Sequence, residues 1–476
     1  MELDKDLRAR QEARQLVKAA AQAQQQLAQM EQAQLDKIVE AVSVAFCGKA
    51  LELAELAVRE TGFGNVDDKI IKNEFASRTL WESVKDMKVV GVLKDDPGEK
   101  LWEIGVPMGV IAAIVPSTNP TSTVCYKAMI ALKAGCSIVF SPHPKALECT
   151  LKAAQTVAKA AYDAGAPAGS VSCLTVPSLD GCRELMGAKQ TNLILATGGP
   201  AMVRAAYSSG KPAIGVGAGN GPAYIHKSAD VDHALECILR SKTFDYGTVC
   251  ASEQSIIVER SMEQPVVTAA RRKGFFFMNP QEAGSLAKLL FKPNGTLNPE
   301  IVGKPATTLA QMAGFSVPRE TRILVAREQE AGPARPYSME KLCPVLAFFV
   351  MEDEEAVLSK VVEVLIHEGS GHTFSMHAQD KETVRKFARQ IPVSRFLVNT
   401  PAALGGIGAT TQLFPALTLG CGAVGGSSSS NNISPMDLVN IRRVAWDSQQ
   451  ARPRSYTHVD DGLVEILTAK ILERLR

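Results

Sequence analysis

Apolar and polar positions divide the chain into a helical N-terminal stretch and two longer stretches in which short apolar runs alternate with helical patterns. Over residues 4–58, apolar residues recur at helical spacing with polar residues between them, which predicts helices. Their apolar face is predicted to dock against the main domain, and the alternative is a face that binds a partner. The residues on this face are Leu7, Leu16, Val17, Ala20, Leu27, Leu35, Ile38, Val39 and Val42.

A series of apolar runs begins at Val110, and helical stretches separate one run from the next. The runs are continuous rather than alternating, which is typical of parallel strands buried on both faces of a sheet. This order predicts a doubly wound α/β domain that, with the N-terminal helices, spans residues 1–225. The predicted strands are 110–115, 137–140, 171–176, 193–196 and 213–216, and the predicted helices are 121–134, 145–162, 179–187 and 200–208.

A second α/β region follows and is predicted to form a domain over residues 226–431. The predicted strands are 255–258, 323–326, 345–350, 373–376 and 396–398, and the predicted helices are 230–241, 280–290, 304–313, 353–367 and 380–390.

The C-terminal part contains three segments with different patterns of apolar and polar residues. Residues 432–447 contain an apolar run that predicts an exposed strand pairing with another chain, with residues 88–107 as a companion hairpin. Residues 448–461 are polar and predict a linker, and residues 462–476 predict an amphipathic helix. This helix is either a docking peptide or a helix folded back onto its own subunit. Its apolar stripe consists of Leu463, Val464, Leu467, Ile471 and Leu475.

The composition is that of an ordinary globular protein, with 46% apolar and 21% charged residues. A formal net charge of +2 gives no electrostatic reason to expect nucleic acid or a membrane surface as a partner. No apolar run approaches the roughly 20 residues that span a bilayer, and the N-terminus lacks the pattern of a secretory signal. We therefore expect a cytoplasmic location.

Ten cysteines are scattered along the chain, and none forms a C-x-x-C pair. This pattern predicts reduced thiols rather than a disulfide framework or a structural zinc site. His367, His372 and His377 do not share one helical face. We therefore predict no metal site.

Cys250 lies between a turn that contains Gly247 and a predicted strand. Its small neighbours leave the sulfur approachable, and a thiol at the end of a loop can be activated by backbone donors. Taken alone, such a cysteine is more often a buried residue without a chemical role. Segments at the ends of other predicted strands favour the chemical role.

These segments are polar or rich in glycine. Asn119 follows the first predicted strand and offers an uncharged amide donor to an oxyanion. Two prolines in 140–144 stiffen a turn after the second strand, where a nucleotide ribose would lie. Segment 196–200 opens a helix, and its glycines would let the backbone approach a pyrophosphate. A further glycine-rich segment spans 215–222, and Glu340 places a carboxylate just before a strand.

The order of the segments resembles the aldehyde dehydrogenase superfamily over about residues 1–447. Segments 114–123, 140–144, 196–221 and 250–254 resemble in particular its coenzyme A-acylating branch. That branch includes aldehyde dehydrogenases of bacterial microcompartments and the first half of bifunctional aldehyde–alcohol dehydrogenases. The resemblance implies two doubly wound α/β domains, the first of which binds a dinucleotide and the second of which carries the nucleophile, and a β oligomerisation arm.

The resemblance also implies roles for individual residues. Cys250 would be the nucleophile, Asn119 would hold the oxyanion, and Glu340 would hold the nicotinamide ribose. His372 would assist proton transfer near the thiol, and the alternative is a loop histidine at the start of a strand. The implied cofactor contacts are Pro116, Thr118, Ser141, Pro142, His143, Thr197, Gly198, Gly199, Val216, Gly217, Glu340 and Leu342.

Two positions depart from the pattern of other branches of the superfamily. Hydrolytic members carry a glutamate where this chain has Val216, and a valine cannot activate water. Coenzyme A is therefore the expected acyl acceptor, because a thiolate needs less activation. The resemblance implies NAD as the cofactor. Pro144 stands where NAD-preferring relatives often carry a glutamate on the adenine ribose, and this departure leaves NADP open as well.

Together these features predict reversible, ping-pong oxidation of acetaldehyde or propionaldehyde to the acyl-CoA through a Cys250 thioester. The alternatives on the same fold are hydrolytic oxidation, acyl phosphate reduction and a structural protein that lost the chemistry. The resemblance further implies a homo-oligomer, either dimer or tetramer. It also implies that residues 462–476 bind microcompartment shell proteins, which would place the enzyme inside such a compartment.

Overall fold

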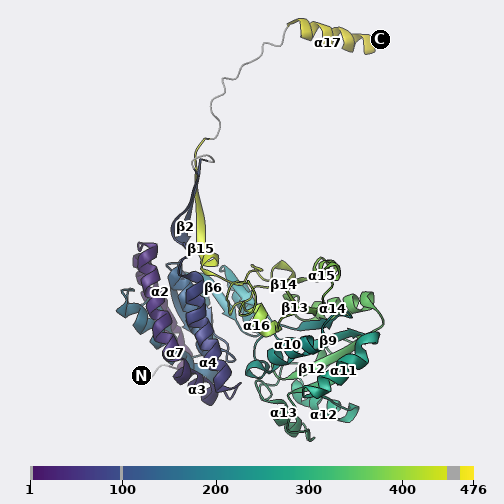
Figure 1. Cartoon of the computed structure of the whole chain (residues 1–476). Coiled ribbons are helices and arrows are strands. Elements are labelled where there is room, and N and C mark those ends of the chain that lie inside the picture. Colours follow the sequence, from purple (N-terminus) through teal and green to yellow (C-terminus); the bar gives the residue numbers. More distant parts are fainter. Residues whose placement is uncertain (1–3, 97–99, 448–460, 476) are drawn as a thin grey trace.

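The computed structural model describes residues 4–96, 100–447 and 461–475. These residues form an N-terminal lobe, a C-terminal lobe, a three-stranded arm and a terminal helix (Figure 1). Both lobes are α/β, and every strand pair within each lobe's sheet is parallel. The predicted fold class is therefore confirmed.

The helices expected over residues 4–58 are α1 (Lys5–Leu27), α2 (Gln32–Cys47) and the first part of α3 (Ala50–Thr61). One face of α1 carries alanines and small aliphatic residues, including Ala13, Val17 and Ala20, which are fully buried. Small side chains let this helix lie close to α8 (Leu179–Gly187) and to the sheet. The predicted docking face is thus buried, apart from Leu16, which is partly buried, and Leu7, which is exposed.

The sheet of the N-terminal lobe has the strand order β5-β4-β3-β6-β7. Along β3, Ala112 and Ile114 pack towards α1 and α8, whereas Ile111 and Ala113 pack towards α2 and α6. The chain proceeds from β3 to one edge of the sheet and then returns to β6, so a topological switch point lies between β3 and β6. The elements are β3 (Val110–Ile114), α6 (Pro120–Lys133), β4 (Ser137–Ser141), α7 (Leu147–Asp163), β5 (Val171–Cys173), β6 (Thr191–Thr197), α9 (Pro200–Tyr207) and β7 (Ala213–Val216).

The sheet of the C-terminal lobe has the strand order β10-β11-β12-β9-β8-β13-β14. Helices α10 (Val231–Thr243) and α11 (Glu263–Arg272) cover one face. Helices α12 (Pro280–Leu290), α13 (Ala306–Met312), α14 (Glu354–His367) and α15 (Lys381–Ala388) cover the other. The strands are β8 (Gly221–Ile225), β9 (Glu253–Glu259), β10 (Phe275–Phe277), β11 (Ile323–Arg327), β12 (Val345–Met351), β13 (Gly371–His377) and β14 (Val393–Val398).

Strand β8 corrects the predicted domain boundary. It pairs with β9 and β13, so the chain enters the C-terminal sheet at Gly221 and not after residue 225. The sequence hides this strand because Pro222 and the preceding glycines are typical of a turn. Strand β10 and helix α11 were also not predicted.

Residues after β14 return to the N-terminal lobe. Short helix α16 (Ala402–Gly406) still packs against α10, β13 and β14 of the C-terminal lobe. After it, Ile407, Ala416, Leu419 and Ile433 lie fully or almost fully buried in the same apolar cluster as α2 and α6. The segment therefore closes the N-terminal lobe with residues that follow the entire C-terminal sheet.

The arm consists of β1 (Gly91–Asp96), β2 (Leu101–Pro107) and β15 (Val439–Ala445), with β2 in the middle and both pairings antiparallel. The hairpin and the C-terminal strand were predicted to lie together, and they do. The strand is shorter than the predicted range 432–447, because η7 (Pro435–Leu438) is a 3-10 helix. Pairing of this arm with another chain remains a prediction.

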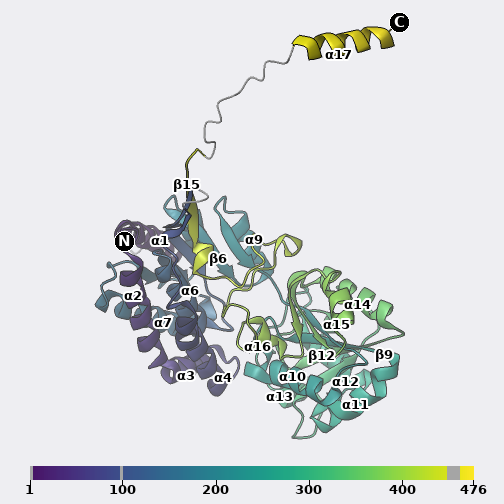
Figure 2. The same ribbon diagram turned by 45° about the horizontal axis from the view of Figure 1, so that its top comes forward.

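The terminal helix α17 (Asp461–Arg474) lies apart from both lobes (Figure 2). Its described apolar side chains, such as Val464, Leu467 and Ile471, are exposed and do not pack against the subunit. The predicted linker lies outside the described residues, apart from Asp461. None of the helices in the described ranges is long and apolar enough to cross a membrane.

Candidate active site

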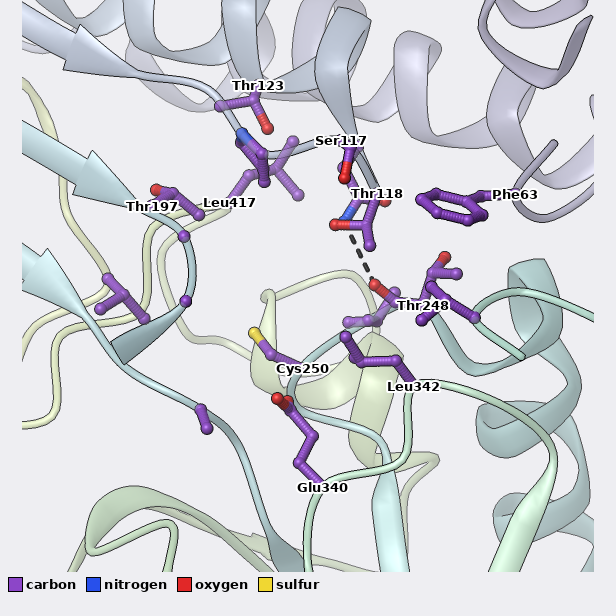
Figure 3. Close-up of a pocket in the computed structure, with 18 of the residues that line it drawn as sticks. Phe63, Ser117, Thr118, Thr123, Thr197, Thr248, Cys250, Glu340, Leu342 and Leu417 are labelled. Atoms are coloured by element: carbon purple, nitrogen blue, oxygen red, sulfur yellow. Dashed lines mark hydrogen bonds between the residues drawn. The ribbon is translucent and has the colours of Figure 1, made fainter. Parts of the chain in front are cut away.

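A cavity of about 310 Å³ lies where the carboxyl ends of the first sheet meet the amino ends of the second (Figure 3). The loops that follow β3, β6 and β7 line it from the N-terminal lobe. Cys250 precedes β9 and Glu340 precedes β12, and these two strands are neighbours in the C-terminal sheet. Strand order therefore brings the thiol and the carboxylate together although they lie far apart in the sequence.

Cys250 follows a backbone segment in an unusual conformation. Asp245, Tyr246 and Gly247 all have φ angles between 47° and 78°, in the left-handed region. For a residue other than glycine this conformation is costly and requires support from its surroundings. The backbone also approaches closely, because a Cβ atom on Gly219 would lie 1.9 Å from the main-chain oxygen of Cys250.

The surroundings of Cys250 keep its thiol protonated at neutral pH. Burial raises its pKa to about 12, and the nearby Glu340 carboxyl and Cys421 thiol act in the same direction. The buried Arg395 guanidinium opposes them. Only the thiolate is a good nucleophile, so the reaction requires a group that removes this proton.

Glu340 is the one carboxylate among the described residues that line the cavity, and it points towards Cys250 (Figure 3). Its Oε1 accepts a hydrogen bond from the backbone N–H of Gly219 at 2.9 Å. Burial raises the pKa of Glu340 to about 8, with a further contribution from Glu368. With this pKa most of the Glu340 carboxyl is protonated at neutral pH, and only its deprotonated fraction, which grows as the pH rises towards 8, can accept a proton from the neighbouring thiol.

Asn119 is the residue that caps the start of α6, yet its side chain does not cap the helix. Asparagine at this position normally accepts a bond from the first turn. Here Nδ2 donates instead to the main-chain oxygen of Thr248 and to Thr118 Oγ1, both at 3.2 Å. The amide donor is therefore held beside the Cys250 loop, at the edge of the cavity.

Most of the predicted cofactor residues line the cavity. Ser141 and Pro142 do not, because they are buried at the end of β4, whereas His143 beside them does. The lining residues from the prediction are Pro116, Thr118, His143, Thr197, Gly198, Gly199, Val216, Gly217, Glu340 and Leu342.

His372 lies behind the Cys250 backbone and does not line the cavity. It is fully buried near the start of β13, and its Nδ1 lies 2.9 Å from Thr373 Oγ1. Burial, with a smaller contribution from Arg395, lowers its pKa to about 3. His372 is therefore neutral at neutral pH.

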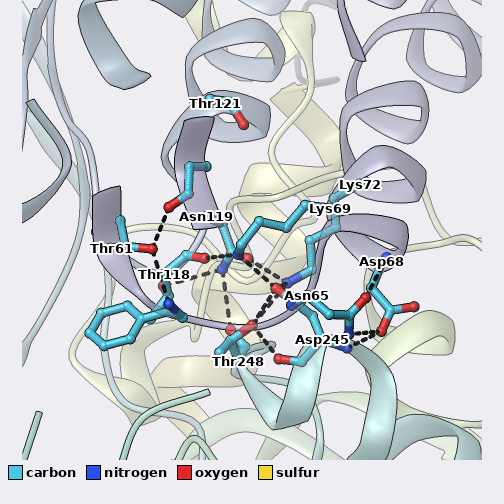
Figure 4. Close-up of polar contacts among 12 residues, drawn as sticks. Thr61, Asn65, Asp68, Lys69, Lys72, Thr118, Asn119, Thr121, Asp245 and Thr248 are labelled. Carbon is cyan, nitrogen blue, oxygen red and sulfur yellow. Dashed lines mark hydrogen bonds and ion pairs between the residues drawn. The ribbon is translucent and has the colours of Figure 1, made fainter. Parts of the chain in front are cut away.

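Three charged residues near the site were not predicted (Figure 4). Lys69 and Lys72 from α4 (Val66–Glu74) both donate to Asp245 Oδ2, and all three side chains are buried. Lys72 also lines the cavity and donates to Asn119. The sequence carries one signal for them, a pair of lysines three residues apart on one helix face, but such a pair is usually solvated.

Within the described residues, no group of three histidine, cysteine, aspartate or glutamate side chains is arranged to hold a metal ion. The chemistry available at the cavity is instead a thiol, an amide donor, a carboxylate and a glycine-rich edge where a helix begins. This set suits addition to a carbonyl carbon.

Comparison with known proteins supports this chemistry. The model of the aldehyde dehydrogenase family matches residues 6–274. The chain is 44% identical over 435 residues to the bifunctional aldehyde-alcohol dehydrogenase AdhE of Escherichia coli K12, covering 90% of this chain and 49% of that protein. It is 33% identical to the succinate-semialdehyde dehydrogenase (acetylating) of Clostridium kluyveri, covering 94% of this chain and 98% of that protein. The chain thus spans about half the length of the bifunctional relatives.

Solved structures agree with these matches. An acetylating aldehyde dehydrogenase from Geobacillus thermoglucosidasius is 46% identical with a TM-score of 0.92, over 94% of this chain and 99% of that chain. A propionaldehyde dehydrogenase from the fucose utilisation microcompartment of Clostridium phytofermentans is 28% identical with a TM-score of 0.83, over 92% and 98%. The propionaldehyde dehydrogenase of Rhodopseudomonas palustris, solved with bound propionyl-CoA, is 27% identical with a TM-score of 0.82, over 91% and 94%.

Proposed function

The chain belongs to the aldehyde dehydrogenase family, and from this premise we propose that it oxidises a short aliphatic aldehyde to its acyl-CoA with NAD. The observation that carries the proposal is the cavity itself. It combines the Cys250 thiol, the Asn119 amide and the Glu340 carboxylate, and it has Val216 where a water-activating glutamate would stand. Acyl transfer to a thiol fits this set better than hydrolysis does.

Each residue has its own proposed role in the reaction. Glu340 at the nicotinamide ribose stays a prediction, and we propose in addition that its deprotonated form accepts the Cys250 proton. The thiolate sulfur then adds to the aldehyde carbon while the carbonyl electrons move to oxygen. Asn119 Nδ2 donates to this alkoxide, for which it gives up one of its two long resting bonds. NAD, when bound, accepts the hydride that leaves carbon. The resulting thioester on Cys250 is then attacked by the thiol of coenzyme A. The bond between the acyl carbon and the Cys250 sulfur breaks, and the proton of the attacking thiol passes to the Cys250 sulfur.

The cavity fits a dinucleotide at its N-terminal side. It lies at the topological switch point, where Gly198 and Gly199 precede the amino end of α9. Thr197 Oγ1 is buried and has no hydrogen-bond partner among the described residues, so it is available to a polar ligand. Pro144 offers no carboxylate to the adenine ribose, and NADP therefore stays a second cofactor to assay.

The lining near the thiol supports a small uncharged substrate. Ile407, Leu417 and Leu419 are aliphatic, and among the described lining residues the one lysine, Lys72, is already bonded to Asp245. A carboxylate or sulfonate on the substrate would find no free ammonium there. Acetaldehyde and propionaldehyde are therefore the proposed substrates.

The test is NADH formation from propionaldehyde and NAD⁺, with coenzyme A, with phosphate and with neither. We expect steady turnover with coenzyme A at least about tenfold faster than without it, because water lacks a base at position 216. Equal turnover without any acceptor would establish hydrolysis, and turnover with phosphate would establish an acyl phosphate reductase. Acetaldehyde serves as the second substrate.

We also propose that the arm assembles copies of this chain and that α17 docks on microcompartment shell proteins. Among the described residues, strand β15 pairs only with β2 and leaves its other side open, and α17 exposes Val464, Leu467 and Ile471. Deleting residues 449–476 is expected to abolish co-purification with shell proteins while the specific activity stays within about twofold. Unchanged co-purification would contradict the docking role and leave the catalytic proposal untouched.

A further inference from the structure

Lys72 is bound on three sides. Its Nζ donates to Asn119 Oδ1 at 2.5 Å, to Thr248 Oγ1 at 3.0 Å and to Asp245 Oδ2 (Figure 4). An ammonium carries three donors, so every one of them has a partner. These partners come from the loop before α6 and from the loop that leads to Cys250, whereas Lys72 itself lies on α4.

The contact with Asn119 determines which end of the amide faces the cavity. A lysine can donate but cannot accept, so the amide oxygen must face Lys72 and the amide nitrogen must face Thr248. The reversed amide would place two N–H groups against an ammonium. Lys72 is 3% exposed, so bulk solvent has little access to its side chain.

Asp245 holds Lys72 in place. Its Oδ1 accepts from the backbone N–H of Asn65 at 2.9 Å, and Oδ2 accepts from Lys69, Lys72 and Thr248 Oγ1. The packing is tight, because a Cβ atom on Gly64 would lie 1.7 Å from Oδ1. The left-handed backbone at Asp245 is therefore fixed by the same contacts that fix Lys72.

From this geometry we infer that Lys72, held by Asp245, is a positioning residue that orients the Asn119 amide for the oxyanion and strengthens it as a donor. A buried ammonium against the amide oxygen polarises the amide and makes its N–H a better donor. The inference rests on the proposed function, because it assumes that Asn119 holds an alkoxide formed at Cys250.

Lys69 provides a matched control. It is as buried as Lys72, lies one helical turn away and donates to the same carboxylate oxygen of Asp245 at 2.9 Å. Its other bond goes to the main-chain oxygen of Thr118 at 3.0 Å and not to Asn119. Replacing either lysine by methionine removes one buried charge from the same cluster, and only Lys72→Met frees the amide.

The experiment measures the first-turnover burst of NADH in the full chain, beside the rate at which iodoacetamide alkylates Cys250. We expect Lys72→Met to slow the burst by about tenfold to a hundredfold. This loss is smaller than the loss expected when the oxyanion donor itself is removed, because the Asn119 amide is still present. Lys69→Met should slow it by less than about threefold. Alkylation should stay within about twofold in both, because thiol reactivity does not require the oxyanion donor.

A double-mutant cycle makes the test specific. In an Asn119→Ala background, Lys72→Met should change the burst by less than about twofold, because the residue through which it acts is gone. Full additivity, or equal losses in the two lysine variants, would overturn the inference. If Lys72→Met does not fold, Lys72→Gln keeps a neutral donor at this position and should give an intermediate loss, and no loss would overturn the inference.

The two proposals fail in different ways. Wild-type protein without acceptor-dependent NADH formation would contradict the proposed function. Wild-type activity with a burst that is insensitive to Lys72 would contradict the positioning role alone.

Discussion

Replacing Cys250 by alanine is expected to abolish NADH formation from propionaldehyde, with a loss on the order of 10⁵-fold or more. Without the sulfur there is no thioester, and no other described cysteine lines the cavity. Binding of NAD should change little, since the glycine-rich edge and the Thr197 region lie on the other lobe. Steady-state kinetics and calorimetric titration with NAD⁺ measure the two quantities.

Cys47 supplies the control for this variant. It is partly exposed and lies on α2, away from the cavity, where Arg78 donates to its sulfur at 3.1 Å. Cys47→Ala should keep full activity and aldehyde-dependent acylation of the protein. Activity of Cys250→Ala within a hundredfold of wild type would refute the assignment of the nucleophile.

Replacing Asn119 by alanine is expected to slow the NADH burst by about 10²- to 10³-fold, equivalent to about 3–4 kcal/mol of transition-state stabilisation. The amide nitrogen donates to the alkoxide, and nothing on alanine replaces it. The affinity for NAD should remain near that of wild type. Stopped-flow measurement of the first turnover isolates this step from acyl transfer.

Asn119→Asp tests whether Asn119 acts as a hydrogen-bond donor or only fills space with a side chain of this shape. Aspartate keeps the size and the contact with Lys72, but it offers the alkoxide an acceptor and a negative charge. We therefore expect a loss at least as large as that of Asn119→Ala. A nearly active aspartate variant would show that Asn119 acts through packing.

The strands of the N-terminal lobe could be predicted to within a few residues, because continuous apolar runs bounded by glycine and proline leave little ambiguity. Strand β8 could not, because Pro222 lies inside it and its burial comes from β9 and β13 on either side. Strand β10 has three residues, too few for any periodicity. Whether these two segments form strands depends on pairing partners that lie far away in the sequence.

The site likewise has residues that the sequence could predict and residues that it could not. Cys250, Asn119 and Glu340 were expected at one site, and they line one cavity. Asn119 follows a strand of the first sheet, whereas Cys250 and Glu340 precede neighbouring strands of the second sheet, and the facing ends of the two sheets bring them together. The only local sign of the Lys72–Asp245 contact was the pair of lysines on one face of α4, and that pattern is usually solvated. The contact joins positions 173 residues apart, and it depends on a left-handed backbone at a residue other than glycine.

The return of the chain after β14 has a consequence for the order of folding during synthesis. The C-terminal sheet uses one uninterrupted stretch, residues 221–398, and can complete its core once that stretch has left the ribosome. The N-terminal lobe is translated first but also needs Ile407, Leu419 and Ile433 to fill its core. The part of the protein that is made first is therefore finished last, and until then its apolar cluster is exposed to chaperones and to other chains.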